Sequence, residues 1–187
     1  MTGAVKYRTI VADPPWDHGR TGVNFSDGGF HNTRVPYPTM DIDDIRRLPV
    51  KDWADDDAHL YLWTTTRWLS RSFSVAESWG FHVGTTLVWA KPMRGFGLGD
   101  AFQSNVEFIL FGRRGHLRPK CRADSSWFQW PRGKHSAKPE SFLDLVEQVS
   151  PGPYLELFAR RQRLGWDTWG NECLEHVSVE CATGGCT

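Results

Sequence analysis

YRTIVADPPW, residues 7–16, is an apolar run that ends abruptly in two consecutive prolines. The β-branched and aromatic residues of its first half predict a buried strand from Tyr7 to Ala12. Proline has no backbone N–H to donate to a sheet ladder, so the strand must end at Asp13. Ligands of α/β sheets bind outside the carboxyl ends of the strands. Asp13 is therefore placed where a functional side chain is expected.

The rest of the chain alternates short apolar runs with stretches of helical period. We expect further strands at residues 58–64, 81–90, 105–111, 154–158 and 166–170. We expect helices at residues 40–48, 66–79 and 139–149. This alternation predicts an α/β fold with crossover connections between strands. We expect one domain spanning residues 1–187, with mobile loops near 17–38, 92–103 and 113–135.

The composition is that of an ordinary globular protein, with 40% hydrophobic and 24% charged residues. No apolar run approaches the roughly 20 residues that span a bilayer, and the first residues do not resemble a signal peptide. A cytoplasmic protein is therefore expected. The four cysteines lack the paired spacing of a zinc site, so we expect them to be reduced and no metal to be bound.

Charge is distributed unevenly along a chain whose formal net charge is zero. Residues 113–138 contain eight Lys or Arg against one acid, which indicates a local contact with an anionic partner. Arg118 and Lys120 are candidates for phosphate contacts, and the tryptophans and phenylalanine at 127–130 are candidates for stacking on bases. The alternative is a solvated loop whose aromatic side chains pack underneath it.

The sequence Asp13-Pro14-Pro15-Trp16 suits the methylation of an aromatic amine. The lone pair of such an amine is delocalised into the ring, so an enzyme assists by accepting hydrogen bonds from both N–H groups. The carboxylate of Asp13 and the carbonyl of Pro14 offer two adjacent acceptors, and the prolines hold that carbonyl rigidly. Trp16 offers a face for base stacking. The alternative is a strand that ends in a tight proline turn over a packed tryptophan.

Five motifs carry a resemblance to a known family, in the family's own order. They are IVADPPW at 10–16, PYPTM at 36–40, HSAKPE at 135–140, LELFAR at 155–160 and WGN at 169–171. Together they resemble the MT-A family of adenine-N6 methyltransferases, which includes the eukaryotic messenger-RNA writers and many bacterial and phage members. The resemblance implies a Rossmann-like fold dependent on S-adenosylmethionine, in permuted order, with the catalytic motif before the cofactor motif.

The resemblance also implies roles for individual residues. The catalytic residues would be Asp13, Pro14, Pro15 and Trp16. Contacts with S-adenosylmethionine would come from Asp13, Lys138, Glu156, Leu157, Phe158, Arg160, Asn171 and Glu172. Trp16 and Tyr37 would flank the target base, with Glu107 near the substrate pocket. Lys138 would contact the methionine carboxylate of the cofactor, which suits a compact ammonium; taken alone, it would be read as a solvated lysine.

The sequence departs from the family pattern in two ways. The segment from Leu155 to Arg160 lacks the glycines of an ordinary cofactor loop. Only 12 residues precede Asp13, so the pocket for the cofactor's adenine is expected to be more open, or completed by the last residues or another subunit. A homodimer or a partner subunit is compatible with this expectation.

The interpretation that follows is an enzyme acting on adenine N6 in DNA. DNA is favoured because the chain is short and carries no appended RNA-binding module, which is an argument by analogy. Adenine N6 in RNA and cytosine N4 in DNA remain open as alternatives. From another class of function, an inactive nucleic-acid-binding partner subunit remains open, although the intact tetrapeptide at 13–16 disfavours it.

Overall fold

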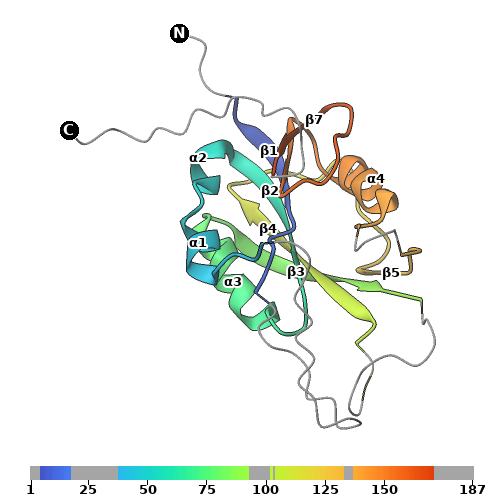
Figure 1. Cartoon of the computed structure of the whole chain (residues 1–187). Helices are drawn as coiled ribbons and strands as arrows, with labels where there is room; N and C mark the ends of the chain where they lie inside the picture. The colour runs from blue at the N-terminus through green and yellow to red at the C-terminus, as the bar shows by residue number, and fades with distance from the viewer. Residues whose placement is uncertain (1–4, 18–37, 93–101, 103, 133–136, 171–187) are drawn as a thin grey trace.

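The computed structural model describes residues 5–17, 38–92, 102, 104–132 and 137–170. Its centre is a seven-stranded sheet in the order β5-β3-β4-β2-β1-β6-β7 (Figure 1). The strands are β1 Tyr7–Ala12, β2 Ala54–Thr64, β3 His82–Ala90, β4 Val106–Arg114, β5 Trp127–Phe128, β6 Tyr154–Leu157 and β7 Trp166–Trp169. The helices are α1 Ile42–Arg47, α2 Val50–Trp53, α3 Leu69–Ser78 and α4 Glu140–Val149.

The sheet is mixed because β4 runs antiparallel to both of its neighbours, β2 and β3. The other pairs of adjacent strands are parallel. This arrangement brings the beginning of β4 to the edge of the sheet where β1, β2 and β3 end. Thr64 at the end of β2 thus pairs with Phe108, and Trp89 near the end of β3 pairs with Glu107. We call this edge, which also carries Asp13, the carboxyl edge.

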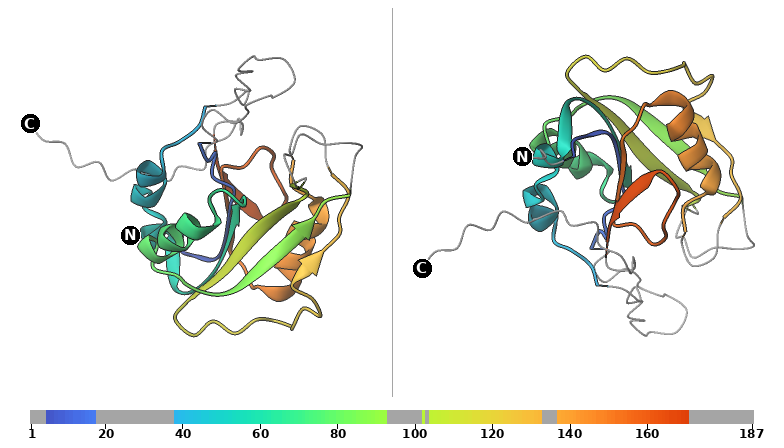
Figure 2. Two further views of the ribbon diagram at one scale, coloured as in Figure 1. Left: turned by 90° about the horizontal axis from the view of Figure 1, so that it is seen from below. Right: turned by 90° about the horizontal axis from the view of Figure 1, so that it is seen from above.

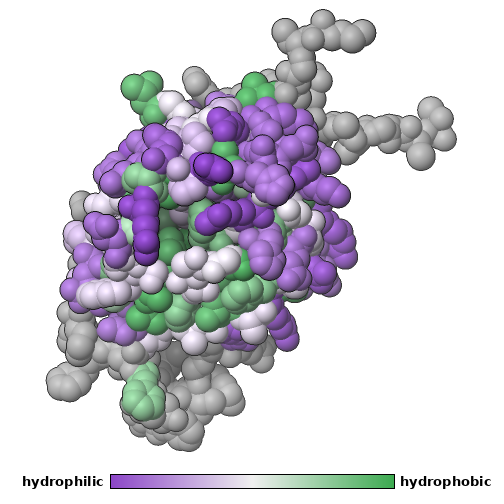
Figure 3. Space-filling model, turned by 180° about the vertical axis from the view of Figure 1, so that it is seen from behind, coloured by the Kyte–Doolittle hydropathy of each residue, from purple (hydrophilic) through white to green (hydrophobic). Residues whose placement is uncertain are grey.

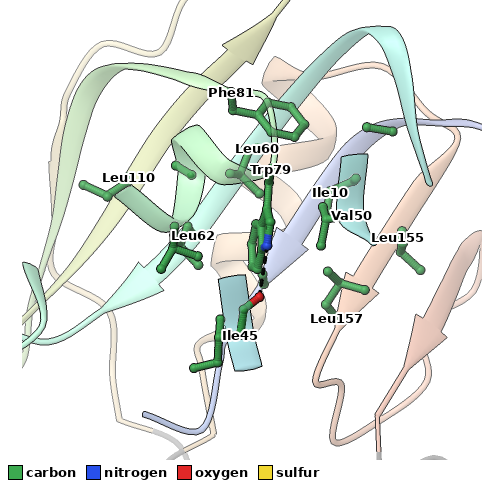
Figure 4. Packing of buried hydrophobic residues seen from close by; sticks show 14 of the residues in the cluster. Ile10, Ile45, Val50, Leu60, Leu62, Trp79, Phe81, Leu110, Leu155 and Leu157 are labelled. Carbon is green, nitrogen blue, oxygen red and sulfur yellow. Dashed lines mark hydrogen bonds between the residues drawn. The ribbon is translucent and has the colours of Figure 1, made fainter. Parts of the chain in front are cut away.

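Helices cover both faces of the sheet (Figures 1 and 2). On one face α1, α2 and α3 bury a core that includes Ile10 and Leu62. Figure 4 shows Trp79 at the centre of this core, where its indole N–H donates to the carbonyl of Ile45 at 3.1 Å. On the other face α4 packs Phe142 against a cluster that includes Trp63. Because side chains alternate along a strand, each central strand serves both cores.

The surface seen from behind is mostly hydrophilic, with apolar side chains gathered toward the lower part of the view (Figure 3). Among the described residues, no helix is both long and apolar enough to cross a membrane.

The predicted α/β class and the predicted strands are confirmed, with shifts at their ends. The predicted helix at 40–48 is found as α1, which ends at Arg47 before Pro49, and the short helix α2 that follows was not predicted. The predicted loop at 113–135 is wrong in part. Arg113 and Arg114 still pair with β2, and Trp127–Phe128 form β5 beside β3. The other two predicted loops lie mostly outside the described residues, at 18–37 and 93–101.

Candidate active site

The Asp13-Pro14-Pro15-Trp16 loop begins at the carboxyl end of β1, as predicted. Three backbone hydrogen bonds hold it. The N–H of Asp13 donates to the carbonyl of Leu157 at 3.4 Å, that of Met40 to Pro15 at 2.9 Å, and that of Trp16 to Pro14 at 2.8 Å. The Pro14 carbonyl therefore already accepts one hydrogen bond, and its second lone pair remains for another donor. The loop is fixed between β6 and the segment that leads into α1.

Trp16 does not present an open face in the described structure. Its side chain is 3% exposed, and its ring stacks on that of Trp68 with centroids 5.8 Å apart. Its indole N–H donates to the carbonyl of Trp63 at 3.0 Å. Burial of a large apolar ring with a satisfied N–H is strongly favourable. The observed position matches the alternative of a proline turn over a packed tryptophan, so the predicted base-stacking face is corrected to an anchor.

Four charged side chains form a chain along the carboxyl edge, in the order Asp13, Lys138, Glu107, Lys91. The ammonium of Lys138 lies 3.0 Å from Oδ2 of Asp13 and 3.0 Å from Oε2 of Glu107. Lys91 pairs with Oε1 of the same Glu107. All four are largely buried, with 16–25% of each side chain exposed. We call these residues the charge chain.

The fold explains why the charge chain assembles. Asp13 follows β1, Lys91 follows β3, and Glu107 lies near the beginning of β4. These three strand ends meet at the carboxyl edge. Lys138 approaches from the segment before α4. Each lysine of the charge chain packs over an aromatic ring. Lys138 lies 4.9 Å from the centroid of Trp63, and Lys91 lies 4.9 Å from that of Trp89. Cation–π contacts of this kind favour the charged form of each lysine.

The charge chain keeps its central members ionised. Burial alone would lower the pKa of Lys138, but the carboxylates of Asp13 and Glu107 outweigh it and raise that pKa. Burial alone would raise the pKa of Glu107, but Lys138 and Lys91 outweigh it and lower that pKa. Glu107 is thus a carboxylate and Lys138 an ammonium at neutral pH. Glu107, predicted to lie near the substrate pocket, shares the ammonium of Lys138 with Asp13 of the catalytic loop.

Glu156 is a buried carboxyl group whose hydrogen bonds are incomplete. It lies in β6 opposite Val11, on the face of the sheet that α4 covers. Burial raises its pKa to about 7; Arg161 opposes this shift, and Asp13 adds to it. Its Oε2 is buried and has no hydrogen-bond partner among the described residues. Because an unsatisfied buried oxygen is costly, this atom is a candidate acceptor for a ligand.

The segment after β6 turns tightly against β7. Phe158 adopts a positive φ of 63°, and its N–H and that of Ala159 both donate to the carbonyl of Trp169, at 2.5 and 3.2 Å. A Cβ on Gly170 would lie 2.7 Å from backbone atoms of Ala159, so only glycine fits there. Leu157, predicted to contact the cofactor, has a fully buried side chain in the core under α1 and α3. Its side chain is therefore a core residue.

Arg161 and Arg163 tie the loop between β6 and β7 to α4. Arg161 pairs with Glu140 at 2.5 Å and donates to the carbonyl of Lys138 at 3.4 Å. Arg163 pairs with Asp144 and Glu147, at 2.6 and 2.8 Å. The predicted cofactor residue Arg160 is partly buried in the same loop. These contacts fix the loop that follows Glu156 against α4 and against the backbone of Lys138.

The structure does not bring Arg118 and Lys120 to the site. Because β4 runs away from the carboxyl edge, the residues after Arg114 leave the sheet at the opposite edge. The two edges are separated by six residue steps along β2, from Ala58 to Thr64, which is about 20 Å. Lys120 there donates to the carbonyl of Glu147, near the end of α4. The predicted contacts of Arg118 and Lys120 with substrate phosphates would therefore lie at the edge of the sheet opposite Asp13.

Three predicted residues, Tyr37, Asn171 and Glu172, lie outside the described residues. Sequence reasoning missed Lys91, Trp63 and Trp89. One signal was available for Lys91, since it is the first charged residue after an apolar strand, as Asp13 is after β1. A lysine at a strand end is usually solvated, so only the register of β3 with β4 distinguishes this one.

Comparison with known proteins identifies the family of the chain. The MT-A70 family model matches residues 7–172. The chain is 33% identical to the type II methyltransferase M.MunI of a Mycoplasma species, over 96% of this chain and 83% of that protein. It is 27% identical to the human N6-adenosine-methyltransferase catalytic subunit METTL3 and 28% identical to the human N6-adenine-specific methyltransferase METTL4. It spans only 28% and 39% of these two longer proteins. The chain belongs to the MT-A70 family of adenine-N6 methyltransferases.

Proposed function

We propose that this protein transfers a methyl group from S-adenosylmethionine to the N6 amine of adenine in DNA. The observation that carries the proposal is Asp13 itself, a largely buried carboxylate at a strand end, held by Lys138 within the charge chain. The sheet and its order of motifs fit a permuted Rossmann-like fold. The catalytic loop follows β1, whereas the proposed cofactor segment follows β6, and the two strands are adjacent and parallel.

The loop has the acceptors that an aromatic amine requires. Lys138 contacts Oδ2 of Asp13, so Oδ1 is the oxygen left to accept from one amine N–H. The second lone pair of the Pro14 carbonyl serves the other N–H. Both hydrogen bonds draw the amine out of conjugation with the ring, which exposes its lone pair for attack. After the transfer the nitrogen carries an extra proton, and the Asp13 carboxylate is placed to take it.

The residues present fit S-adenosylmethionine, which supplies a methyl group already activated on a sulfonium. Lys138 has three N–H donors and uses two in the charge chain, which leaves one for the methionine carboxylate. Glu156 has a buried oxygen that needs a donor, and ribose hydroxyls are donors of the right kind. Arg160 and Phe158 follow in the same loop. Positioning the amine and the methyl donor in line is then the main catalytic task.

One comparison favours DNA over RNA. The relative that is 33% identical and covered over 83% of its length is a type II methyltransferase, whereas the match to the N6-adenosine methyltransferase METTL3 is 27% identical and covers 28% of that protein. An adenine in a DNA duplex must be extruded before its amine reaches the carboxylate of Asp13. Adenine in RNA remains the second candidate, because the chemistry at Asp13 is the same for both nucleic acids.

The test uses the purified chain with methyl-labelled S-adenosylmethionine and three substrates: single-stranded DNA, duplex DNA and RNA. Digestion to nucleosides identifies the labelled product. We expect N6-methyldeoxyadenosine; N6-methyladenosine from RNA alone would reverse the choice of substrate, and label at cytosine N4 would overturn the choice of base. Asp13→Asn is the matched variant. It keeps the side-chain shape, and we expect it to bind S-adenosylmethionine by calorimetry but not to turn over.

A further inference from the structure

Glu107 is the one member of the charge chain with a separate ammonium on each carboxylate oxygen. Lys138 lies 3.0 Å from its Oε2, and Lys91 contacts its Oε1. Lys91 is itself held in place. Its backbone N–H donates to the carbonyl of Asn105 at 2.7 Å, and its ammonium lies over the ring of Trp89. Only 19% of its side chain is exposed, so this is not a solvated surface pair.

The positive and negative charges of the charge chain balance only when Lys91 is present. Two carboxylates, Asp13 and Glu107, then face two ammonium groups in a largely buried place. Without Lys91, the single ammonium of Lys138 would be shared between two carboxylates. Each carboxylate in a poorly solvated site disfavours ionisation of the other, so loss of Lys91 favours protonation of one of them. Glu107, the more buried of the two, is the one we expect to do so.

We propose that Lys91 is a positioning residue of the active site. By binding Oε1 of Glu107, Lys91 holds this carboxylate in place and so keeps Lys138 between Glu107 and Asp13. Lys91 touches neither the amine nor the methyl donor. It acts through Glu107 and Lys138 on the orientation of the Asp13 carboxylate. This inference rests on the proposed function, because it concerns the same loop and the same reaction.

The consequence for the reaction is a dependence on pH. The groups that face Glu107 are the two lysines on either side of it, with Asp13 beyond Lys138 and the rings of Trp63 and Trp89 beneath. An opposite charge within hydrogen-bond distance lowers the pKa of a carboxyl group by about 1–3. Loss of the Lys91 charge therefore raises the pKa of Glu107 and moves the acidic limb of the activity profile toward neutral pH.

The variants are Lys91→Met, which keeps the length of the side chain without its charge, and Lys91→Arg, which keeps the charge. Lys51→Met is the matched control, because Lys51 is exposed on α2, outside the charge chain. For each we would measure kcat/KM against pH, the Kd of S-adenosylmethionine and the Tm. We expect the acidic midpoint to rise by about 1–3 in Lys91→Met, to return in Lys91→Arg and to stay unchanged in Lys51→Met.

A uniform loss of kcat/KM in Lys91→Met that follows a lower Tm, with an unchanged midpoint, would overturn the inference, because it would mean that Lys91 only supports folding. A second readout needs no activity. Carbon-13 NMR of labelled glutamate, assigned with Glu107→Gln, reports the titration of Glu107 directly. If the wild type methylated no nucleic acid, the proposed function would fail. An unmoved Glu107 titration in Lys91→Met would instead refute the role of Lys91.

Discussion

Replacing Glu156 with glutamine should make the protein more stable and less functional at the same time. The pKa of Glu156 is raised from 4.5 to about 7, chiefly because the carboxyl group is buried in β6. A raised pKa means that folding disfavours the ionised form. The resulting penalty is absent below the unfolded pKa of 4.5, grows as the pH rises, and is complete above the folded pKa of about 7.

The size of this penalty follows from the difference between the two pKa values. Each pKa unit corresponds to about 1.4 kcal/mol, so the ionised carboxylate costs about 3 kcal/mol at pH 8. Glutamine has a similar shape and no charge to desolvate. We therefore expect Glu156→Gln to raise the free energy of unfolding by about 2–3 kcal/mol at pH 8 and by less than about 1 kcal/mol at pH 5. For a chain of this size the rise at pH 8 is about 5–10 °C in Tm.

Urea unfolding of the wild type and Glu156→Gln at several pH values between 5 and 8 is the direct assay. The same samples provide the Kd of S-adenosylmethionine, which we expect to weaken in the variant because an ionised acceptor becomes a neutral amide. A stability difference that is the same at pH 5 and pH 8 would refute the reasoning about burial. Unchanged cofactor affinity with the expected stability gain would remove Glu156 from the cofactor site and leave the electrostatic argument standing.

Three further predictions follow from the described contacts. Lys138→Met leaves two largely buried carboxylates without their shared cation, so we expect a loss of about 2–4 kcal/mol in urea unfolding at pH 7 and no turnover; wild-type stability would contradict this. Gly170→Ala places a Cβ against the backbone of the neighbouring loop and should lower Tm by about 3–10 °C, whereas Gly84→Ala, which meets open space, should not. The double variant Arg118→Glu, Lys120→Glu should leave KM unchanged for a single-stranded substrate of about three nucleotides, because such a strand spans only about 10 Å when stacked and cannot reach from the carboxyl edge to the opposite one; a large rise in KM would show that the two edges share a substrate path.

The sequence predicted the strands well because their signal is local. Apolar runs of strand length lie at residues 7–12, 58–64 and 154–158, and the prolines after Asp13 mark the end of β1 without reference to the rest of the chain. Two features lay beyond this kind of reasoning. The two-residue strand β5 is too short to carry a period, and the reversed direction of β4 is a property of the sheet.

In the candidate site, too, some residues were found from the sequence, whereas their contacts depend on the fold. Asp13 and Lys138 were found because they stand in motifs, and Glu107 was assigned by the family resemblance. Their ion pairs depend on how β1, β4 and the segment before α4 meet. The distance of Arg118 and Lys120 from Asp13 was also beyond sequence reasoning, since their basic charge is visible in the sequence and the direction of β4 is not. The burial of Trp16 was also undecidable from its motif, because a tryptophan in a loop serves equally as an anchor or as a stacking surface.

The buried Trp16 ring makes the catalytic loop part of the hydrophobic core rather than an appendage to it. Its stack on Trp68 and its bond to the Trp63 carbonyl can be broken only by opening the core between β1, β2 and α3. Heat should therefore not loosen the loop before the rest of the protein. Activity should persist nearly to the midpoint of thermal unfolding and then vanish together with the fold, in one cooperative step.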